Sequence, residues 1–186
     1  MAEIKSYNLT IEIPQGAEVK LEKNIAIIKG IKGEIKKIFT NPRIDVTKEG
    51  NTITIKTKQG TKAIQQDKTY VYTYQSHINN MLKGAMYGYT SKLKICAGHF
   101  PMQVTADANT VSIKNFLGEK VPRKAAIMPH VKVIVTGDII QVTGADKEAV
   151  AQTAARIEQA TRITNKDRRI FQDGCYIIEK AGEKNE

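Results

Sequence analysis

Residues 24–34 read Asn-Ile-Ala-Ile-Ile-Lys-Gly-Ile-Lys-Gly-Glu, and residues 109–119 read Asn-Thr-Val-Ser-Ile-Lys-Asn-Phe-Leu-Gly-Glu. The two stretches align without a gap and share an asparagine, an Ile-Lys pair and a Gly-Glu pair at the same positions. In each, β-branched residues lead into a turn that contains glycine, as in a β-hairpin. This internal similarity predicts that the chain repeats one structural unit.

The features that follow these stretches also repeat, in the same order. Hairpin-type turns at Gly50-Asn51 and Gly137-Asp138 each separate two runs of alternating β-branched residues. Each hairpin is followed by a helical pattern, over residues 68–86 and 146–163, with Asp67 and Asp146 as the expected N-caps. The apolar residues expected on the buried helix faces are Val71, Tyr74, Ile78, Met81, Leu82 and Ala85 in the first and Val150, Ala154 and Ile157 in the second.

These patterns predict an α+β fold with two tandem duplicated domains, each a small antiparallel sheet packed against one helix. The chain has 186 residues, of which 41% are hydrophobic, and this is enough for two small cores. We expect the first domain over residues 1–86, the second over residues 87–180 with a cationic tail, and a polar end over residues 181–186.

The charge balance favours a polyanionic partner. The chain carries 29 basic and 19 acidic residues, a formal net charge of +10. Residues 1–5 do not have the basic and then apolar pattern of a secretory signal, and no apolar run approaches the ~20 residues of a membrane span. We therefore expect a cytoplasmic protein without a membrane partner, in which Cys96 and Cys175 stay reduced.

Residues 159–180 combine cationic and aromatic residues in one segment. They read Gln-Ala-Thr-Arg-Ile-Thr-Asn-Lys-Asp-Arg-Arg-Ile-Phe-Gln-Asp-Gly-Cys-Tyr-Ile-Ile-Glu-Lys. Lys166, Arg168 and Arg169 can reach several phosphates of a polyanion, and an Asp173-Gly174 pair indicates a tight turn that would fix their positions. Such residues hold a ligand and offer no obvious nucleophile or base.

Two glycine-containing segments have alternative interpretations. Gly30-Ile31-Lys32-Gly33 has the form of the clamp with which some RNA-binding domains hold phosphates, but its β-branched neighbours favour a hairpin turn. Residues 115–120 are followed by Arg123 and Lys124, so this loop either delivers charge to a nucleic-acid backbone or is an ordinary turn with Phe116 packed inward.

Cys96 and His99 have the spacing of metal ligands, and His130 and Cys175 could complete a zinc site. Only one half-motif is present, so structural roles are favoured for all four residues. The remaining alternative is a thiol-dependent or zinc-dependent enzyme that uses Cys96 and His99. We expect no catalytic residue, no metal and no cofactor.

The tail also resembles a known family, the universal large-subunit ribosomal protein called six in bacteria and nine in eukaryotes. Its signature is met here by Gln159, Ile163, Lys166, Arg169, Phe171, Asp173, Gly174, Tyr176, Ile177 and Lys180. Cys175 is the one departure, since it stands where an aliphatic residue is usual, and it is small and apolar. Further matches lie at residues 28–33, 80–84, 99–101 and 115–120.

The resemblance implies two α+β domains that bind large-subunit rRNA near the sarcin-ricin loop and the translation-factor-binding region. The implied rRNA contacts are Arg123, Lys124, Lys166, Arg168, Arg169 and Lys180. Four further residues are expected to shape the turn of the tail, namely Phe171, Asp173, Gly174 and Tyr176. The implied partners are rRNA, neighbouring ribosomal proteins and translation GTPases nearby, for a structural protein of the cytoplasmic ribosome that assembles in the nucleolus if the source is eukaryotic.

Overall fold

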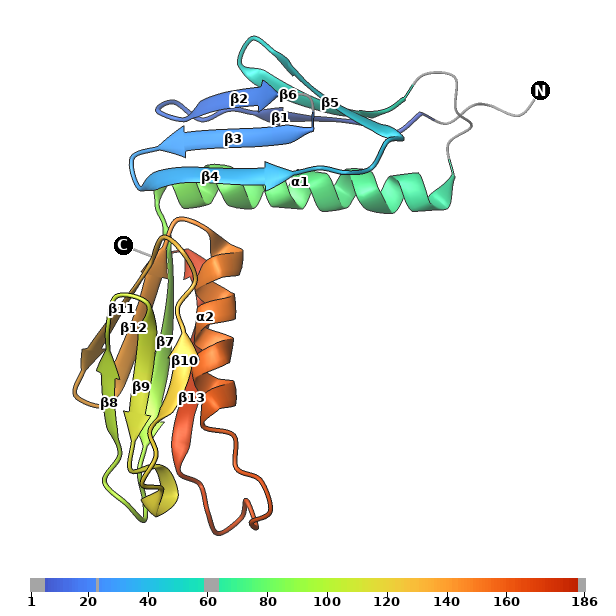
Figure 1. Ribbon diagram of the computed structural model, residues 1–186. Coiled ribbons are helices and arrows are strands. Elements are labelled where there is room, and N and C mark those ends of the chain that lie inside the picture. Colours follow the sequence, from blue (N-terminus) through green and yellow to red (C-terminus); the bar gives the residue numbers. More distant parts are fainter. Residues whose placement is uncertain (1–5, 23, 59–63, 184–186) are drawn as a thin grey trace. The chain divides into compact units, whose positions relative to one another are not determined.

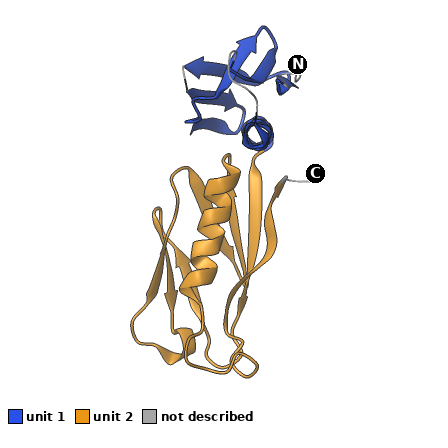
Figure 2. Ribbon diagram, turned by 90° about the vertical axis from the view of Figure 1, so that its right-hand side faces the viewer, with its two compact units in different colours: residues 1–87 blue, residues 88–186 orange. Residues whose placement is uncertain are grey.

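The computed structural model describes residues 6–22, 24–58 and 64–183 (Figure 1). The chain divides into two compact units, Met1–Tyr87 (unit 1) and Gly88–Glu186 (unit 2), which are coloured separately in Figure 2. Neither helix in the described ranges is long and apolar enough to cross a lipid bilayer.

Unit 1 consists of two three-stranded antiparallel sheets and one helix in the part of the chain that the structure describes. The strand orders are β1-β6-β5 and β2-β3-β4. The elements are β1 (Asn8–Glu12), β2 (Glu18–Glu22), β3 (Ile25–Gly30), β4 (Gly33–Ile38), β5 (Ile44–Glu49), β6 (Thr52–Thr57) and α1 (Gln65–Met86). The helix contacts strands of both sheets, so one helix covers the core of the whole unit (Figure 1).

The core of unit 1 follows the periodicities of its sequence. Ala26 and Ile28 of β3 and Ile53 and Ile55 of β6 are buried, while the residues between them are partly exposed. The whole apolar stripe predicted for the helix at residues 71–85 is also buried. That prediction is confirmed, and α1 packs through this stripe.

The start of α1 differs from the prediction that Asp67 is the N-cap. Ile64 holds the N-cap position, and Asp67 is the third residue of the helix. The Asp67 carboxylate accepts the Ile64 amide at 3.0 Å, and its two oxygens accept from the Arg43 guanidinium at 2.8 Å each. Asp67 therefore supports the helix start from inside the first turn and ties it to the segment before β5.

The turn from Gly30 to Gly33 joins β3 to β4, which confirms the hairpin interpretation of this segment. Gly33 has φ +149°. At Gly30 the requirement is space, since a Cβ atom would lie 2.5 Å from the Ala85 carbonyl oxygen of α1. The Lys32 amide donates to that same oxygen at 2.9 Å, so the hairpin is fixed to the end of the helix.

Unit 2 has a three-stranded and a four-stranded antiparallel sheet in its described residues, again with one α-helix. The strand orders are β10-β9-β8 and β11-β12-β7-β13. The elements are β7 (Tyr89–Cys96), β8 (Gln103–Ala106), β9 (Thr110–Lys114), the short 3₁₀ helix η1 (Phe116–Gly118), β10 (Arg123–Ala126), β11 (Val131–Thr136), β12 (Ile139–Gly144), α2 (Lys147–Ala160) and β13 (Gly174–Glu183).

The pairing of strands shows the repeat. The order β7-β12-β11 of unit 2 corresponds to β1-β6-β5 of unit 1, and β8-β9-β10 corresponds to β2-β3-β4. The aligned residues Val111 and Ile113 are buried like Ala26 and Ile28. The predicted α+β fold of two repeated units is confirmed, and the structure adds that each unit divides its strands between two sheets. Unit 2 also has an extra strand, β13, on the open edge of β7.

The helix α2 begins as predicted, because the Asp146 carboxylate accepts the Glu148 amide at 3.0 Å in the N-cap position. It ends at Ala160, three residues earlier than predicted, and Val150, Ala154 and Ile157 are buried. Side chains at its C-terminal end bond to two amides on the free edge of β13. Glu158 Oε1 accepts the Ile177 amide at 3.1 Å, and Thr161 Oγ1 accepts the Cys175 amide at 2.9 Å.

Candidate nucleic-acid interface

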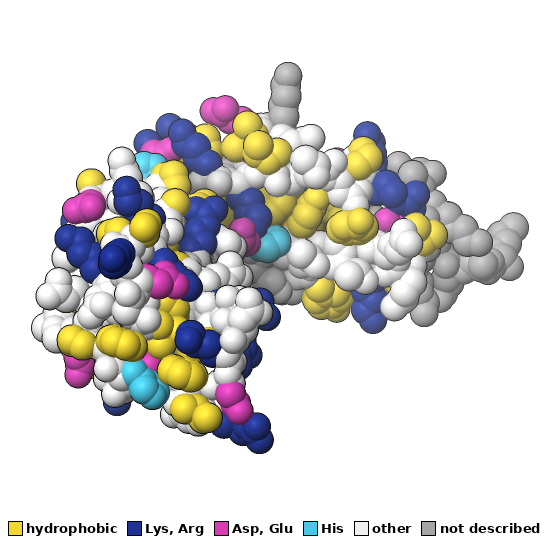
Figure 3. Space-filling view, turned by 60° about the horizontal axis from the view of Figure 1, so that its bottom comes forward, with side chains coloured by type: hydrophobic (Ala, Val, Ile, Leu, Met, Phe, Trp, Pro, Cys, Tyr) yellow, Lys and Arg dark blue, Asp and Glu magenta, His cyan; other side chains and the backbone are white. Residues whose placement is uncertain are grey.

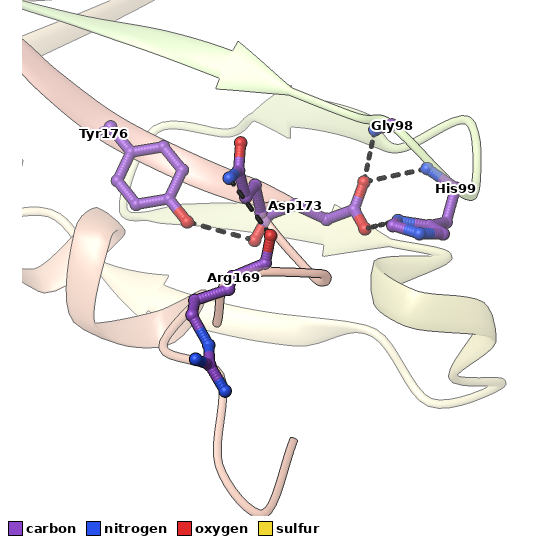
Figure 4. Close-up of polar contacts among 6 residues, drawn as sticks. Gly98, His99, Arg169, Asp173 and Tyr176 are labelled. Carbon is purple, nitrogen blue, oxygen red and sulfur yellow. Dashed lines mark hydrogen bonds and ion pairs between the residues drawn. The ribbon is translucent and has the colours of Figure 1, made fainter. Parts of the chain in front are cut away.

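The segment from Thr161 to Asp173 links α2 to β13, and we call it the cationic loop. It lies at the bottom of Figure 1 and holds no helix or strand. Its far end is anchored by Asp173, which is 2% exposed. The Asp173 carboxylate accepts the amides of Gly98 and His99, the latter at 3.0 Å, and lies 2.8 Å from the His99 ring nitrogen Nδ1 (Figure 4).

These contacts set the charge of Asp173. Burial alone would raise the pKa of the carboxyl group, but the hydrogen bonds from His99 and Gly98 outweigh it and hold the pKa below its ordinary value. The carboxylate therefore stays ionised while almost wholly covered by protein. It connects the end of the cationic loop to the segment that follows β7.

The tight turn lies earlier in the cationic loop than the sequence indicated. The Asp167 carbonyl oxygen accepts the amides of Ile170 at 3.2 Å and Phe171 at 2.9 Å, and the turn covers residues 168–170. The prediction of a tight turn at Asp173-Gly174 is wrong, because Asp173 acts through its buried side chain and Gly174 is already the first residue of β13.

The four residues expected to shape this region all contribute to its packing. The Phe171 ring lies 4.9 Å from the His99 ring, and the Lys166 ammonium lies 4.8 Å from the Phe171 ring centre. A Cβ atom on Gly174 would lie 3.3 Å from the Tyr176 ring. The Tyr176 hydroxyl donates to the Asp173 carbonyl oxygen at 3.4 Å.

Three predicted cations come together on the cationic loop. Lys166, Arg168 and Arg169 are all exposed, and the side chain of Arg169 is 90% exposed. Arg169 pairs with Asp167 at 2.9 Å, and this hydrogen bond raises the pKa of the guanidinium and lowers that of the carboxyl group. In Figure 3, which brings the bottom of Figure 1 forward, Lys and Arg side chains lie among hydrophobic ones.

Arg123 has a different environment from these cations. Its guanidinium donates to both oxygens of Glu119, at 2.8 and 2.6 Å, and to the main-chain oxygens of Ala160 and Arg162, at 2.9 and 3.2 Å. It also lies 4.2 Å from the centre of the buried Phe116 ring. Arg123 thus fastens the end of α2, and the start of the cationic loop, to the segment before β10.

The other two predicted contacts, Lys124 and Lys180, are exposed on strands. Lys124 follows Arg123 in β10 and faces the opposite side of that strand. Lys180 lies six residues after the start of β13, roughly 20 Å along an extended strand. The structure thus clusters three of the six predicted cations on one loop and places the others on β10 and β13.

A pocket of about 970 Å³ opens beside the cationic loop, and sequence reasoning did not predict it. Its walls come from the end of β7 and the residues after it (residues 96–99), from the end of α2, from the cationic loop and from β13. They include Ile163, Arg168, Ile170, Gln172 and Tyr176. The pocket combines apolar walls with two cationic side chains, Arg162 and Arg168.

The structure also bears on the alternative of a zinc or thiol enzyme. Within residues 6–22, 24–58 and 64–183, no three His, Cys, Asp or Glu side chains lie close enough together to hold a metal ion. Both cysteines are free, and burial raises the pKa of the Cys175 thiol to about 12. Asp173 does orient the His99 ring, but no hydrogen bond joins Cys96 to His99 among the contacts of the described residues.

A family model described as ribosomal protein L6 matches the chain over residues 13–88 and again over residues 100–174. The chain belongs to the ribosomal protein L6 family. Apart from residue 88, the two matched segments fall in the two structural units, so the L6 pattern and the structure show the same repeat.

Curated members of the L6 family are similar over nearly their whole length. The large ribosomal subunit protein uL6 of Methanobrevibacter smithii is 43% identical over 170 residues, which cover 91% of this chain and 94% of that protein. The protein of the same name from Methanosarcina mazei is 42% identical over 178 residues, which cover 96% and 99%. The predicted family is thereby confirmed.

Sequence reasoning about this L6 chain missed the anchoring role of Asp173 and the internal role of Arg123. Asp173 and its partner His99 are 74 positions apart, so no local pattern connects them. Arg123 pairs with Glu119, four residues earlier, although the segment between them is not helical, so the spacing alone did not indicate this contact. Cys175, the departure from the signature, is fully buried, as the usual aliphatic residue would be.

Proposed function

We propose that this protein is a structural constituent of the large ribosomal subunit and holds rRNA through the cationic loop of unit 2. One observation carries the proposal: three exposed cations lie on one loop whose two ends are fixed to the folded unit, by Arg123 at the start and by Asp173 at the end. Membership in the L6 family and the names of the two relatives support the same assignment.

The physical basis is phosphate recognition. An RNA duplex hides its base edges in a deep and narrow groove, so proteins bind it mainly through its phosphates, its 2′-hydroxyl groups and its shape. A loop fixed at both ends presents its cations at defined spacing and loses little conformational freedom on binding. Lys166, Arg168 and Arg169 would meet the phosphates, and Lys124 and Lys180 would extend the contact onto β10 and β13.

Arg123 has a different part in this proposal. Four of its five N–H groups already donate within the protein, so its main contribution would be to position the cationic loop. Any direct contact of Arg123 with rRNA would use the remaining donor.

We further propose that the binding site lies near the sarcin-ricin loop and the factor-binding region of the subunit. Unit 1 would then face neighbouring ribosomal proteins, with translation GTPases nearby. The resemblance of the tail to its family supports this placement. In this role the protein braces the cytoplasmic ribosome and carries out no chemistry, so Cys96 and His99 would serve the structure only.

Sedimentation tests the proposal. A tagged copy of the chain, expressed in its source cells, should move with the large subunit in a sucrose gradient. The double variant Lys166→Glu with Arg169→Glu should move there in smaller amounts, because it places negative charge against phosphates. A matched double reversal in unit 1, Lys20→Glu with Lys68→Glu, changes the net charge equally at exposed positions.

The control pair should leave co-sedimentation with the large subunit close to that of the unmodified chain. Unmodified protein that stays at the top of the gradient would contradict the assignment as a whole. Normal sedimentation of the Lys166 and Arg169 variant would remove the cationic loop from the proposed interface.

A further inference from the structure

The pocket beside the cationic loop has properties that phosphate binding alone does not use. Its volume of about 970 Å³ is at the upper end of the range for small-ligand sites. Two large apolar side chains on its walls are exposed to solvent, Ile170 by 63% and Tyr176 by 41%. Apolar groups gathered in a hollow of the surface mark a contact site more often than scattered ones do.

Tyr176 is held in one orientation within this pocket. Its hydroxyl donates to the Asp173 carbonyl oxygen, and its ring lies against the backbone of Gly174 where any larger residue would place a Cβ atom. Asp173 is itself fixed by its contacts to Gly98 and His99 (Figure 4). A ring fixed in this way can stack on a planar partner with little further loss of conformational freedom.

The polar groups of the pocket suit a nucleotide. Arg162 and Arg168 line it and can meet a phosphate or stack on a base. The carboxylate of Glu158, which also lines the pocket, already accepts the Ile177 amide. The amide side chains of Gln159 and Gln172 can pair with the edge of a base.

We propose that this pocket receives one unpaired base of the rRNA, with Tyr176 as the stacking surface and Arg168 on the adjoining phosphate. This inference rests on the proposed function, because it assumes that the cationic loop lies on RNA. Recognition of bulged and looped RNA by proteins commonly stacks a splayed-out base on an aromatic ring. In this proposal the cationic loop binds the phosphates of an RNA duplex, and the pocket binds an unpaired base next to that duplex.

Equilibrium binding of the full chain to protein-free large-subunit rRNA tests the pocket. Tyr176→Leu removes the stacking ring and should weaken binding about 5- to 150-fold, the range found when one base loses an aromatic partner. The slope of affinity against salt should not change, since no phosphate contact is lost. Tyr176→Phe keeps the ring and should retain most of the affinity.

A matched control is Tyr70→Leu, because Tyr70 lies on α1 of unit 1 and is 46% exposed. It should bind rRNA as the unmodified chain does. If Tyr176→Leu disturbs folding, Ile170→Ser is the second variant, since this exposed side chain lies in a turn of the loop. It should also weaken binding severalfold at constant salt slope.

The outcomes separate the two proposals. Unchanged affinity of folded Tyr176→Leu, or of Ile170→Ser where the former does not fold, overturns the base pocket. The salt-dependent binding of the unmodified chain would then still support the proposed function. Failure of the unmodified chain to bind rRNA at any salt concentration would contradict the proposed function itself.

Discussion

At the scale of single residues, the charged side chains of Asp173 and Arg123 hold the cationic loop in place. The Asp173 carboxylate is covered by protein, and its hydrogen bonds to Gly98 and His99 join two segments far apart in the sequence. Arg123 joins α2 to the segment before β10 in a similar way. These two side chains hold the ends of the cationic loop, and the exposed cations lie between them.

Replacing Asp173 should loosen this region. Asp173→Ala leaves the amides of Gly98 and His99 without an acceptor, and the expected loss of stability in unit 2 is about 1–3 kcal/mol. Hydrogen exchange of the His99 amide measures the effect locally and should become faster. Asp167→Ala removes an exposed carboxylate from the same loop and should leave this exchange unchanged.

The contribution of Asp173 to stability should also depend on pH. Its pKa in the folded protein lies below the value of about 3.9 for an unfolded chain, so the ionised form favours folding. The stabilisation is complete above about pH 4 and is lost as the pH falls further through the folded pKa. The difference in unfolding free energy between the unmodified chain and Asp173→Ala should therefore shrink below pH 4, and a constant difference would contradict this origin.

Arg123 and Lys124 should respond differently to substitution although they are neighbours. Arg123→Lys cannot reproduce the paired contact with Glu119, so unit 2 should lose stability on the order of 1 kcal/mol. Its rRNA binding should keep the original salt slope. Lys124→Gln should instead retain the stability of unit 2 and reduce the salt dependence of rRNA binding. If both variants changed stability and salt dependence alike, the proposed difference between Arg123 and Lys124 would be contradicted.

Residue types alone identified the candidate cations but not their roles. Lys166, Arg168 and Arg169 are exposed, as a surface interface requires, and Arg169 also pairs with Asp167. The sequence could not show that Arg123 is engaged internally by carbonyl groups of residues 160 and 162. Contacts of that kind depend on tertiary packing, which leaves no local pattern.

At the scale of elements, each unit is held by the contact of one helix with two sheets. The hairpin of β3 and β4 is fixed to the end of α1 through Gly30 and Lys32. Two amides on the edge of β13 donate to Glu158 and Thr161 at the end of α2. These contacts give hydrogen-bond partners to main-chain groups at the end of a helix and at the edge of a sheet.

The close approach at Gly30 gives a prediction for unit 1. Gly30→Ala forces a Cβ atom against the Ala85 carbonyl oxygen of α1, and the expected loss of stability is about 1–3 kcal/mol. The Lys32 amide, which donates to the same oxygen, should exchange faster with solvent. Gly182→Ala is the control, because its Cβ atom would lie 3.6 Å from the nearest atom.

Much of the element structure could be predicted from periodicity. Alternating residues gave the hairpins, and spacing of three and four gave the buried stripes of both helices, because burial imposes these periods directly. Helix ends were less predictable, since Asp67 can support a helix from its third residue as well as from the cap. The division of each unit into two sheets depends on long-range pairing, which periodicity does not encode.

At the scale of the whole molecule, the chain carries a net charge of +10 on two repeated units. The repeat extends to the order of strand pairing, and unit 2 adds β13 and the cationic loop to it. We therefore expect the two units to have diverged in role, with rRNA binding concentrated in unit 2. The net charge alone could not have shown this, because it does not locate the exposed cations.

The central claim is that the cationic loop holds rRNA through its phosphates, and the salt dependence of binding tests it most directly. Affinity of the full chain for large-subunit rRNA should fall steeply as salt rises. The logarithm of the binding constant, plotted against the logarithm of the salt concentration, should fall with a slope of about 0.7–0.9 for each phosphate neutralised. The triple variant Lys166→Gln, Arg168→Gln, Arg169→Gln should reduce that slope by about two to three. Affinity that stays constant between low and near-molar salt, or an unchanged slope in the triple variant, would contradict the claim.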